Sequence, residues 1–375
     1  MNLRELAKLG RCRVLWVAAN QYQPSIFVGF LFDPSITGGK EGTMAEPELS
    51  LLPGIEAGLD TGLLAGVDEA GLGPILGPLV VAGVTIEGPK GRDPWDLLDR
   101  LVCRHRVVKG KVQVADSKKV HSGRYGLQRL ERTLLSFWGA LHNEIPRTAG
   151  DLLAHCNADT ASLAHCPWYG DLSLPLPLAN NRDDLELFAH MLQRDMAYQG
   201  VQLHDLAIRP VDVEEFNTSI LDTNNKGETH FHAYSDVIGR MLRIMPGDAH
   251  LVADRCGGRV HYAPGLRRHL KQWQVRTIKE TAQCSVYEVV RDNHKIRISF
   301  TSRGEDRSFP TALASCAAKY VREIMMTMVN QWFQAKIPDL KRTAGYYVDG
   351  NRFLADVGEL LETEGFPTER LIRSR

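Results

Sequence analysis

The stretch Gly66-Val67-Asp68-Glu69-Ala70-Gly71-Leu72-Gly73-Pro74, followed after two residues by Gly77-Pro78, carries the strongest pattern in the chain. Residues 64–67 predict a short buried strand that runs into two adjacent acids, and a glycine-rich turn follows. Adjacent carboxylates repel each other, so a folded protein tolerates them best beside a cation or in open solvent. Glycines let backbone N–H groups approach a ligand closely. The stretch therefore indicates a ligand site at the end of a strand.

Strands and helices are predicted to alternate along the rest of the chain. Short apolar runs predict further strands at 79–86, 206–211, 250–253, 275–278, 285–290 and 295–301. Apolar residues at helical spacing predict helices at 125–138, 232–245, 310–333 and 351–364. This order favours an α/β fold in which helices flank a mixed sheet. The strand at 250–253 ends in Asp254, which would meet Asp68 if the two strands are neighbours.

The composition is that of an ordinary globular protein. The 375 residues carry 45 basic and 45 acidic side chains, with 43% hydrophobic and 24% charged residues, which excludes disorder throughout. Any nucleic-acid binding must then come from a local basic patch. Seven scattered cysteines without close pairs indicate reduced thiols and a cytoplasmic location. No apolar run is long enough to span a membrane, and we expect a monomer.

Three regions flank or interrupt the predicted domain. Residues 1–60 form an N-terminal extension, in which Met44 is an alternative start that would leave the first 43 residues untranslated. The domain itself is predicted at 61–362. Residues 140–205 contain four prolines and are interpreted as an insertion or a subdomain boundary. Residues 363–375 are predicted to be a C-terminal tail.

Other acids occur in suggestive places. Asp116 opens the block Asp116-Ser117-Lys118-Lys119, and Glu305 and Asp306 precede the helix that begins near Pro310. Taken singly, each acid is more typical of a helix cap or an exposed surface. One of them together with Asp68, Glu69 and Asp254 would give four carboxylates, a hard oxygen cage suited to Mg²⁺ or Mn²⁺.

These blocks resemble the type 2 ribonuclease H family (ribonuclease HII-like), in its archaeal and eukaryotic style, with some divergence. The first stretch resembles the family motif GVDEAGRGP followed by GP. Further blocks follow in family order over 64–135 and 205–358, whereas 140–205 has no counterpart. The matching blocks are the DSK-like Asp116 to Lys119, the strand from Leu251 to Gly258, the helix block from Ala314 to Glu323, and the loop with Gly345, Tyr346 and Asp349.

The resemblance implies a ribonuclease H-like fold and an endonuclease that hydrolyses the RNA strand of RNA–DNA hybrids with two metal ions, leaving a 3′-hydroxyl. It implies that Asp68, Glu69 and Asp254 are catalytic metal ligands. Two alignments of the fourth acid are open. Counting back from the helix block without gaps gives Glu305, whereas the acid-x-x-aromatic-proline spacing gives Asp306, which we prefer.

The resemblance also implies a set of substrate-binding residues: Gly71, Leu72, Gly73, Lys118, Lys119 and Tyr346. Leu72 departs from the family, which has arginine there for recognising a ribonucleotide joined to DNA. Leucine cannot donate a hydrogen bond, so we predict weak junction specificity but retained hydrolysis. Basic residues between Arg100 and Arg132 and at 267–271 predict a groove that follows phosphates. A ribonuclease H-like module that binds nucleic acid without cutting it is the alternative.

Overall fold

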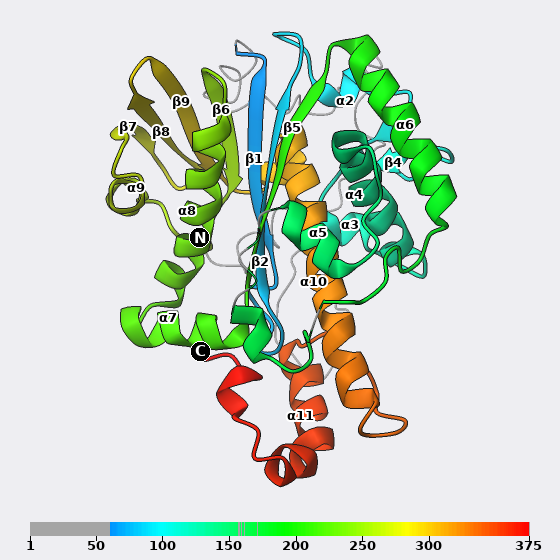
Figure 1. The fold of residues 1–375 in the computed structure, drawn as a ribbon. Coiled ribbons are helices and arrows are strands. Elements are labelled where there is room, and N and C mark those ends of the chain that lie inside the picture. Colours follow the sequence, from blue (N-terminus) through cyan, green and yellow to red (C-terminus); the bar gives the residue numbers. More distant parts are fainter. Residues whose placement is uncertain (1–60, 157, 159, 161, 171, 375) are drawn as a thin grey trace, which may run out of the picture. The chain divides into compact units, whose positions relative to one another are not determined.

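The computed structural model describes residues 61–374, except 157, 159, 161 and 171. The predicted N-terminal extension at 1–60, including Met44, lies outside the described residues. A seven-stranded mixed sheet in the order β5-β2-β1-β6-β9-β8-β7 organises the described part (Figure 1). The fold is thus α/β with a mixed sheet flanked by helices, as predicted.

Each strand predicted from the sequence is present. The strands of the large sheet are β1 (Leu63–Ala70), β2 (Leu79–Glu87), β5 (Gln202–Val211), β6 (Ala249–Asp254), β7 (Gln274–Glu280), β8 (Cys284–Arg291) and β9 (His294–Thr301); β3 (Val102–Cys103) and β4 (Val112–Gln113) form a separate pair. Strand β1 pairs with β2 antiparallel and with β6 parallel. The two strands that carry the acids are therefore neighbours that run in the same direction.

Helices cover both faces of the sheet. They are α2 (Pro94–Leu97), α3 (Ser117–Val120), α4 (Gly126–His142), α5 (Ala149–His155), α6 (Arg182–Gln199), α7 (Val213–Thr223), α8 (Lys226–Ile244), α9 (Ala263–His269), α10 (Phe309–Gln334) and α11 (Tyr347–Thr363), with short 3₁₀ turns η4 (Ser162–His165), η5 (Gly304–Asp306) and η6 (Thr368–Arg370). Strand β2 alternates its side chains, so Val80 and Val84 join the hydrophobic cluster with α4 and α10, and Leu79 and Val81 join the cluster with α8.

Gly66 allows α10 to lie directly on β1. A Cβ atom at this position would lie 2.0 Å from the backbone nitrogen of Thr311, so only glycine permits this approach. The hydroxyl of Thr311 donates a hydrogen bond to the carbonyl of Val252 on β6 at 2.8 Å. Helix α10 is therefore fixed across the two acid-bearing strands, and this contact fixes the position of its next turn relative to the acids.

The segment at 140–205 is more regular than predicted. It contains the 18-residue helix α6, which packs on α4. Leu185, Phe188 and Leu192 of α6 belong to the same hydrophobic cluster as α10. The segment therefore shares the main core, while its status as an insertion stays a prediction. Within 61–374, none of the described helices is both long enough and apolar enough to cross a membrane.

The C-terminal residues return to the glycine-rich stretch. Ile372 forms an isolated β-bridge with Leu76, and the backbone N–H of Arg373 donates to the carbonyl of Ile75 at 2.9 Å. The backbone N–H of Ser374 donates to Asn217 of α7 at 2.7 Å. The region predicted as a tail is thus bound to the loop that follows β1.

Candidate metal centre

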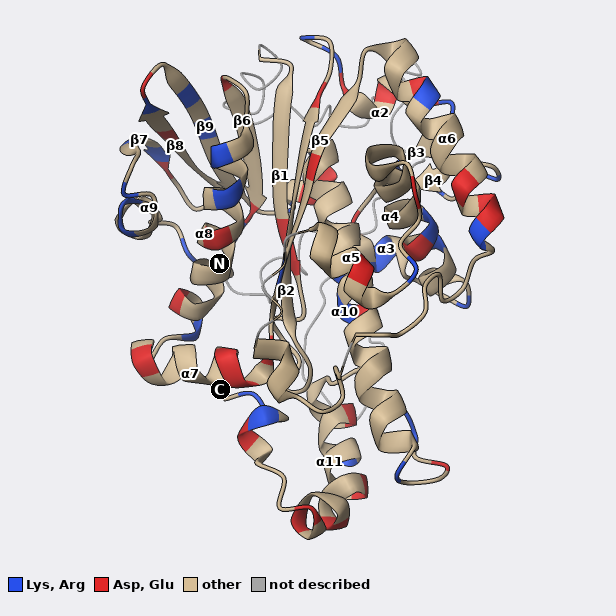
Figure 2. Ribbon diagram, viewed as in Figure 1, with Lys and Arg blue, Asp and Glu red and all other residues tan. Residues whose placement is uncertain are grey.

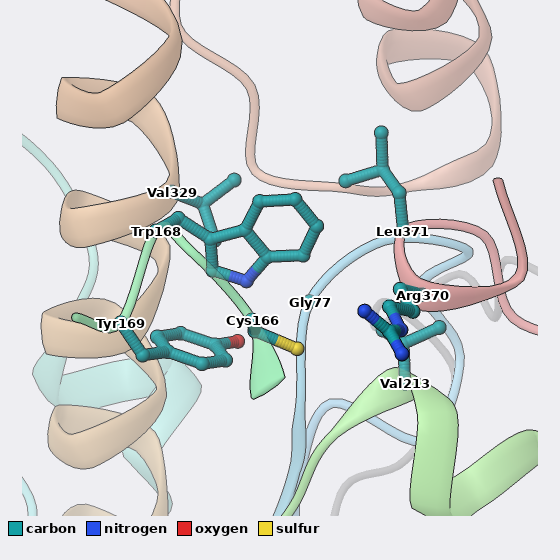
Figure 3. A pocket seen from close by; sticks show the side chains of 8 residues that line it. All are labelled: Gly77, Cys166, Trp168, Tyr169, Val213, Val329, Arg370 and Leu371. Atoms are coloured by element: carbon teal, nitrogen blue, oxygen red, sulfur yellow. The ribbon is translucent and has the colours of Figure 1, made fainter. Parts of the chain in front are cut away.

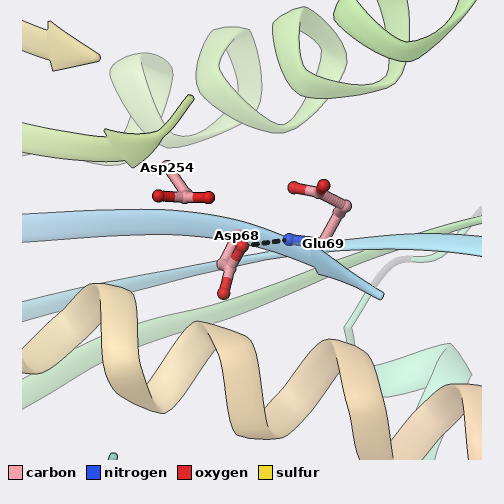
Figure 4. Close-up of side chains that lie close together, drawn as sticks. All are labelled: Asp68, Glu69 and Asp254. Atoms are coloured by element: carbon pink, nitrogen blue, oxygen red, sulfur yellow. Dashed lines mark hydrogen bonds between the residues drawn. The ribbon is translucent and has the colours of Figure 1, made fainter. Parts of the chain in front are cut away.

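Three carboxylates from two neighbouring strands meet at one place. Asp68 and Glu69 lie near the end of β1, and Asp254 is the last residue of β6. The parallel register pairs Val67 with Ala253, so the next residue of each strand is an acid. One carboxylate oxygen from each acid lies within 4.8 Å of the others (Figure 4). The sequence prediction that Asp68 and Asp254 converge is confirmed.

Asp68 faces α10 and is the most buried acid of the three. Its side chain is 7% exposed, and its Oδ1 accepts a hydrogen bond from the backbone N–H of Glu69 at 2.8 Å. Burial raises the pKa of Asp68 well above its usual value, and repulsion from Glu69 and Asp254 adds to the rise. Ser315 of α10 opposes the shift through a hydrogen bond. A cation beside Asp68 would favour its ionised form.

Glu69 points to the opposite side of β1, where α8 packs (Figure 4). The hydroxyl of Tyr234 donates a hydrogen bond to Oε2 of Glu69, and Nε2 of His230 lies 3.5 Å from Oε1. Burial by itself would raise the pKa of Glu69, but His230 and Tyr234 more than offset it, so this pKa is lowered. The two α8 side chains thus hold Glu69 ionised and in one orientation.

His230 and Tyr234 were not predicted as site residues. They are four residues apart and so lie on one face of α8, a spacing that is shared by any helix with a buried side. Both side chains are buried, with exposed fractions of 2% and 0%. Only the packing of α8 on β1 shows that this face meets Glu69.

Asp254 is held from the other side by the turn after β9. The backbone N–H of Gly304 donates to its Oδ1 at 3.0 Å. Burial raises the pKa of Asp254 to about 6. The backbone hydrogen bonds to this carboxylate oppose the rise, and the charge of Glu69 adds to it. The strands therefore hold three mutually repelling acids in place, an arrangement that a divalent cation would stabilise.

The two candidates for the fourth acid have different surroundings in η5. Asp306 is neutralised by Lys119, whose Nζ lies 2.8 Å from Oδ1, and by Arg303, whose Nε lies 2.9 Å from Oδ2. The structure brings neither Asp306 nor Glu305 into the group of three acids. Burial raises the pKa of Glu305 to about 7, and the charge of Asp254 adds to this shift. The fourth ligand stays a prediction, but these contacts favour Glu305 over the preferred Asp306.

The block at 116–119 lies beside the acids through α10. The carboxylate of Asp116 caps α3 by accepting from the backbone N–H of Lys118 at 3.0 Å, as its sequence position predicted. The hydroxyl of Ser315 accepts from the N–H of Ser117 at 3.3 Å. Lys118 is exposed beside this contact, whereas Lys119 is engaged with Asp306.

The glycine-rich stretch is open on one side and closed on the other. Gly71 has a φ of +91°, and a Cβ atom there would lie 2.4 Å from Nε of Arg322. A Cβ atom on the exposed Gly73 would meet nothing within 4 Å. Leu72 is half-buried and packs against the hydrophobic cluster beneath α8. Gly73 therefore leaves room for a ligand to approach the backbone.

Tyr346 lies next to the same stretch. The carbonyl of Gly345 accepts a hydrogen bond from the N–H of Ile75 at 2.8 Å, which ties the two loops together. The side chain of Tyr346 is 51% exposed. The structure thus places the predicted glycines and the predicted tyrosine side by side, with the aromatic ring available to a ligand.

Many of the basic residues near the block at 116–119 have partners within the chain. The guanidinium of Arg104 lies 4.1 Å from the ring centroid of Trp95, and Arg100 pairs with Asp195 at 3.5 Å. Figure 2 shows further basic residues around α9 and the strands β7 to β9. The predicted phosphate groove stays a prediction, because no described contact shows a ligand path.

No protein-family model and no curated protein sequence matches this chain. Among solved structures, the chain is similar to a chain of the PCNA:RNase HII complex from Archaeoglobus fulgidus, with a TM-score of 0.37, 16% identity, and 84% of this chain and 94% of that chain covered. It is similar to Bst-RNase HIII in complex with Mn²⁺, with a TM-score of 0.39 and 13% identity, and the match covers 90% of this chain and 73% of that chain. It is also similar to ribonuclease H2 from Pyrococcus horikoshii OT3, with a TM-score of 0.34 and 12% identity, and the match covers 82% of this chain and 92% of that chain.

Proposed function

We propose that this chain is a metal-dependent endonuclease that hydrolyses the RNA strand of RNA–DNA hybrids and leaves a 3′-hydroxyl. The observation that carries the proposal is the meeting of Asp68, Glu69 and Asp254 within 4.8 Å at the ends of two parallel strands. The same three acids are those that the sequence resemblance marks as metal ligands. The proposal therefore rests on site geometry together with the motif.

The acids suit a hard divalent cation. Burial and mutual repulsion raise the pKa of both Asp68 and Asp254, so the ionised cluster needs positive charge. Oxygen donors alone favour Mg²⁺ or Mn²⁺ over softer metals. Asp68, Glu69 and Asp254 would hold the metal, with Glu305 as the fourth acid. Bound divalent cations lower the pKa of water and stabilise the charge that develops on the leaving oxygen.

The chain's own residues position the acids and the substrate. Tyr234 and His230 orient Glu69, and the N–H of Gly304 fixes Asp254. The open side of Gly73 lets its backbone N–H approach the ribose 2′-hydroxyl, the group that distinguishes RNA from DNA. The exposed ring of Tyr346 offers a stacking surface for a nucleotide.

Leu72 limits which hybrids are cut well. Its side chain packs towards α8 and offers no hydrogen bond to a ribonucleotide–DNA junction. We therefore expect slower cutting at a single ribonucleotide than within a long RNA stretch, and Leu72→Arg should narrow this difference. Equal rates for the original chain on both substrates would contradict this expectation.

The alternative function is a module that binds nucleic acid without cutting it. It is favoured by Asp306, which is neutralised by Lys119 and Arg303 and stays apart from the three acids. The nuclease needs Glu305 as the fourth metal ligand, whereas the binding module does not. The cytoplasmic location and the monomeric state also remain predictions.

A cleavage assay with the full chain separates the two functions. With Mg²⁺ or Mn²⁺, we expect a labelled RNA–DNA hybrid to be cut, and Asp68→Asn to abolish the cut. Glu305→Gln should lower the rate far more than Asp306→Asn, because Asp306 is paired outside the acid group. Hybrid binding without any cleavage would overturn the nuclease proposal and favour the binding module.

A further inference from the structure

Two arginines are buried beneath the glycine-rich stretch without an acidic partner. Arg322 of α10 is 1% exposed, and Arg373 near the C-terminus is 4% exposed. In residues 61–374 as described, neither arginine forms an ion pair. Nε and Nη1 of Arg322 and Nε and Nη2 of Arg373 have no hydrogen-bond partner. Buried charges are normally paired, so this arrangement needs a physical explanation.

Backbone carbonyls satisfy only part of each guanidinium. Nη1 of Arg373 donates to the carbonyl of Gly71, and Nη2 of Arg322 donates to the carbonyl of Leu76 at 3.3 Å and to that of Ala344 at 3.0 Å. These contacts point both side chains at the loop that follows β1. The ring of Phe216 also faces Arg373, with 4.8 Å from Cζ to the ring centroid. Neutral carbonyls and an aromatic ring do not cancel two positive charges, and the remaining buried N–H groups have no acceptor.

The neighbouring acid is already used elsewhere. Glu323 follows Arg322 in the helix, but its Oε1 pairs with Nζ of Lys319 at 2.6 Å. Burial lowers the pKa of Arg373 to about 9, and the positive charge of Arg322 adds to this effect. Both guanidiniums lie against Gly71: Nε of Arg322 would be 2.4 Å from a Cβ atom there, and Nη1 of Arg373 donates to the carbonyl of the same residue. Taking each ion out of water is unfavourable unless a counter-charge is near.

We propose that Arg322 and Arg373 form a phosphate-binding site that takes a phosphate group of the bound nucleic acid. The proposal rests on the proposed function for the source of the phosphate. Guanidinium groups match the geometry of phosphate oxygens through paired N–H donors. Arg322 lies seven residues after Ser315, which is about 10 Å along the helix. The phosphate at this site would therefore belong to a nucleotide away from the one cleaved at the acids.

Tyr346 is the exposed neighbour of this site. Its ring lies over the guanidinium of Arg322, with 5.8 Å from Cζ to the ring centroid, and it is 51% exposed. A separate crevice lined by Tyr169, Arg370 and Leu371 has no space for a water molecule, and neither Arg322 nor Arg373 lines it (Figure 3). We therefore expect a phosphate to reach Arg322 past Tyr346, where a nucleotide would stack.

The first experiment needs no variant. The thermal midpoint of the full chain is measured during titration with inorganic phosphate, with sodium chloride at matched ionic strength as the reference. We expect a saturable rise in the low millimolar range, of about 2–4 °C at ten times the dissociation constant. A midpoint that is the same in phosphate and in chloride would overturn the site.

Variants then assign the effect to the pair. Arg373→Gln and Arg322→Gln should remove the phosphate response, and Arg373→Lys should keep part of it. Arg370→Gln is the matched control, because Arg370 lies in the same segment but pairs with Glu214 at 3.2 Å and lies further out. A full response in Arg373→Gln would overturn the assignment. If this variant does not fold, Arg373→Lys and the phosphate titration of the unaltered chain still decide.

Competition identifies the source of the phosphate. An RNA–DNA hybrid, bound in Ca²⁺ to suppress cutting, should abolish the phosphate response and lose about tenfold or more in affinity when Arg373 is replaced by Gln. A phosphate response that the hybrid leaves intact would show a site for free phosphate and overturn the nucleic-acid assignment. Phosphate binding without any cleavage would instead leave this site standing and remove only the nuclease proposal.

Discussion

Replacing Asp68 by Asn should stabilise the metal-free protein while it removes the metal response. At 4.8 Å and an effective dielectric constant of about 20, two unit charges repel by about 3.5 kcal/mol. The variant removes this repulsion for two pairs, with Glu69 and with Asp254. Because its raised pKa already lets Asp68 avoid part of the cost by taking up a proton, we expect a gain of about 1–3 kcal/mol.

The shape of the side chain should not limit this gain. Asn keeps an oxygen that can accept the hydrogen bond from the N–H of Glu69. A gain of about 1–3 kcal/mol corresponds to a rise in midpoint of about 2–6 °C for a domain of this size. The rise should be seen by circular dichroism in excess EDTA at neutral pH.

Divalent metal should make the original chain more stable than Asp68→Asn, the reverse of their order in EDTA. At one hundred times the dissociation constant, Mn²⁺ would stabilise the original chain by about 2.7 kcal/mol, whereas Asp68→Asn should gain little. Asp306→Asn is the control, since it removes contacts to Lys119 and Arg303 and should not stabilise the metal-free protein. The reasoning is refuted if Asp68→Asn is no more stable than the original chain in EDTA and responds equally to Mn²⁺.

Three further changes test other parts of the account. Gly66→Ala places a methyl group 2.0 Å from the backbone of α10 and should lower the free energy of unfolding in urea by about 3 kcal/mol or more. Gly83→Ala is the control and should lower it less, because its new methyl group meets only side-chain atoms among its nearest neighbours. Equal losses in the two variants would contradict the packing argument. Tyr234→Phe should weaken Mn²⁺ binding about tenfold through the lost hydrogen bond to Glu69, and unchanged affinity in calorimetry would count against that role. Burial lowers the pKa of His250 from 6.5 to about 4. As the pH falls below 6.5, the unfolded chain takes up a proton at this histidine and the folded chain does not, so the free energy of unfolding falls by about 3 kcal/mol between pH 6.5 and pH 4. His250→Gln should flatten this part of the stability profile, and an identical acid dependence would speak against it.

The strands and their acids could be predicted because local patterns determine them. Val67 and Ala253 end apolar runs immediately before acids, and alternating or continuous apolar residues suffice to mark buried strands. The neighbouring placement of these strands was only a condition in the prediction, because strand order depends on contacts between residues far apart in sequence.

Other parts of the site depend on packing that no local pattern contains. Tyr234 has the spacing of an ordinary helix face, and only the seating of α8 on β1 brings it to Glu69. Arg373 lies in a segment that was predicted to be a tail, and its partner loop is some 300 residues away along the chain. The preference for Asp306 followed a motif spacing, whereas the charges of Lys119 and Arg303 decide where that side chain points.

Helix α6 is a different case, since its pattern was available. Asn181 caps the helix, and Leu185, Phe188 and Leu192 follow at helical spacing. All four prolines of the segment at 140–205 precede Asn181, so they do not interrupt the helical pattern that follows it.

The most direct test of the central claim is the uptake of Mn²⁺ by the full chain, followed by the loss of the free-ion signal in electron paramagnetic resonance. The claim is that Asp68, Glu69 and Asp254 together hold a divalent cation. It predicts saturable binding that weakens at least tenfold in Asp254→Asn and stays intact in Asp306→Asn. Equal Mn²⁺ uptake by the original chain and by Asp254→Asn would contradict it.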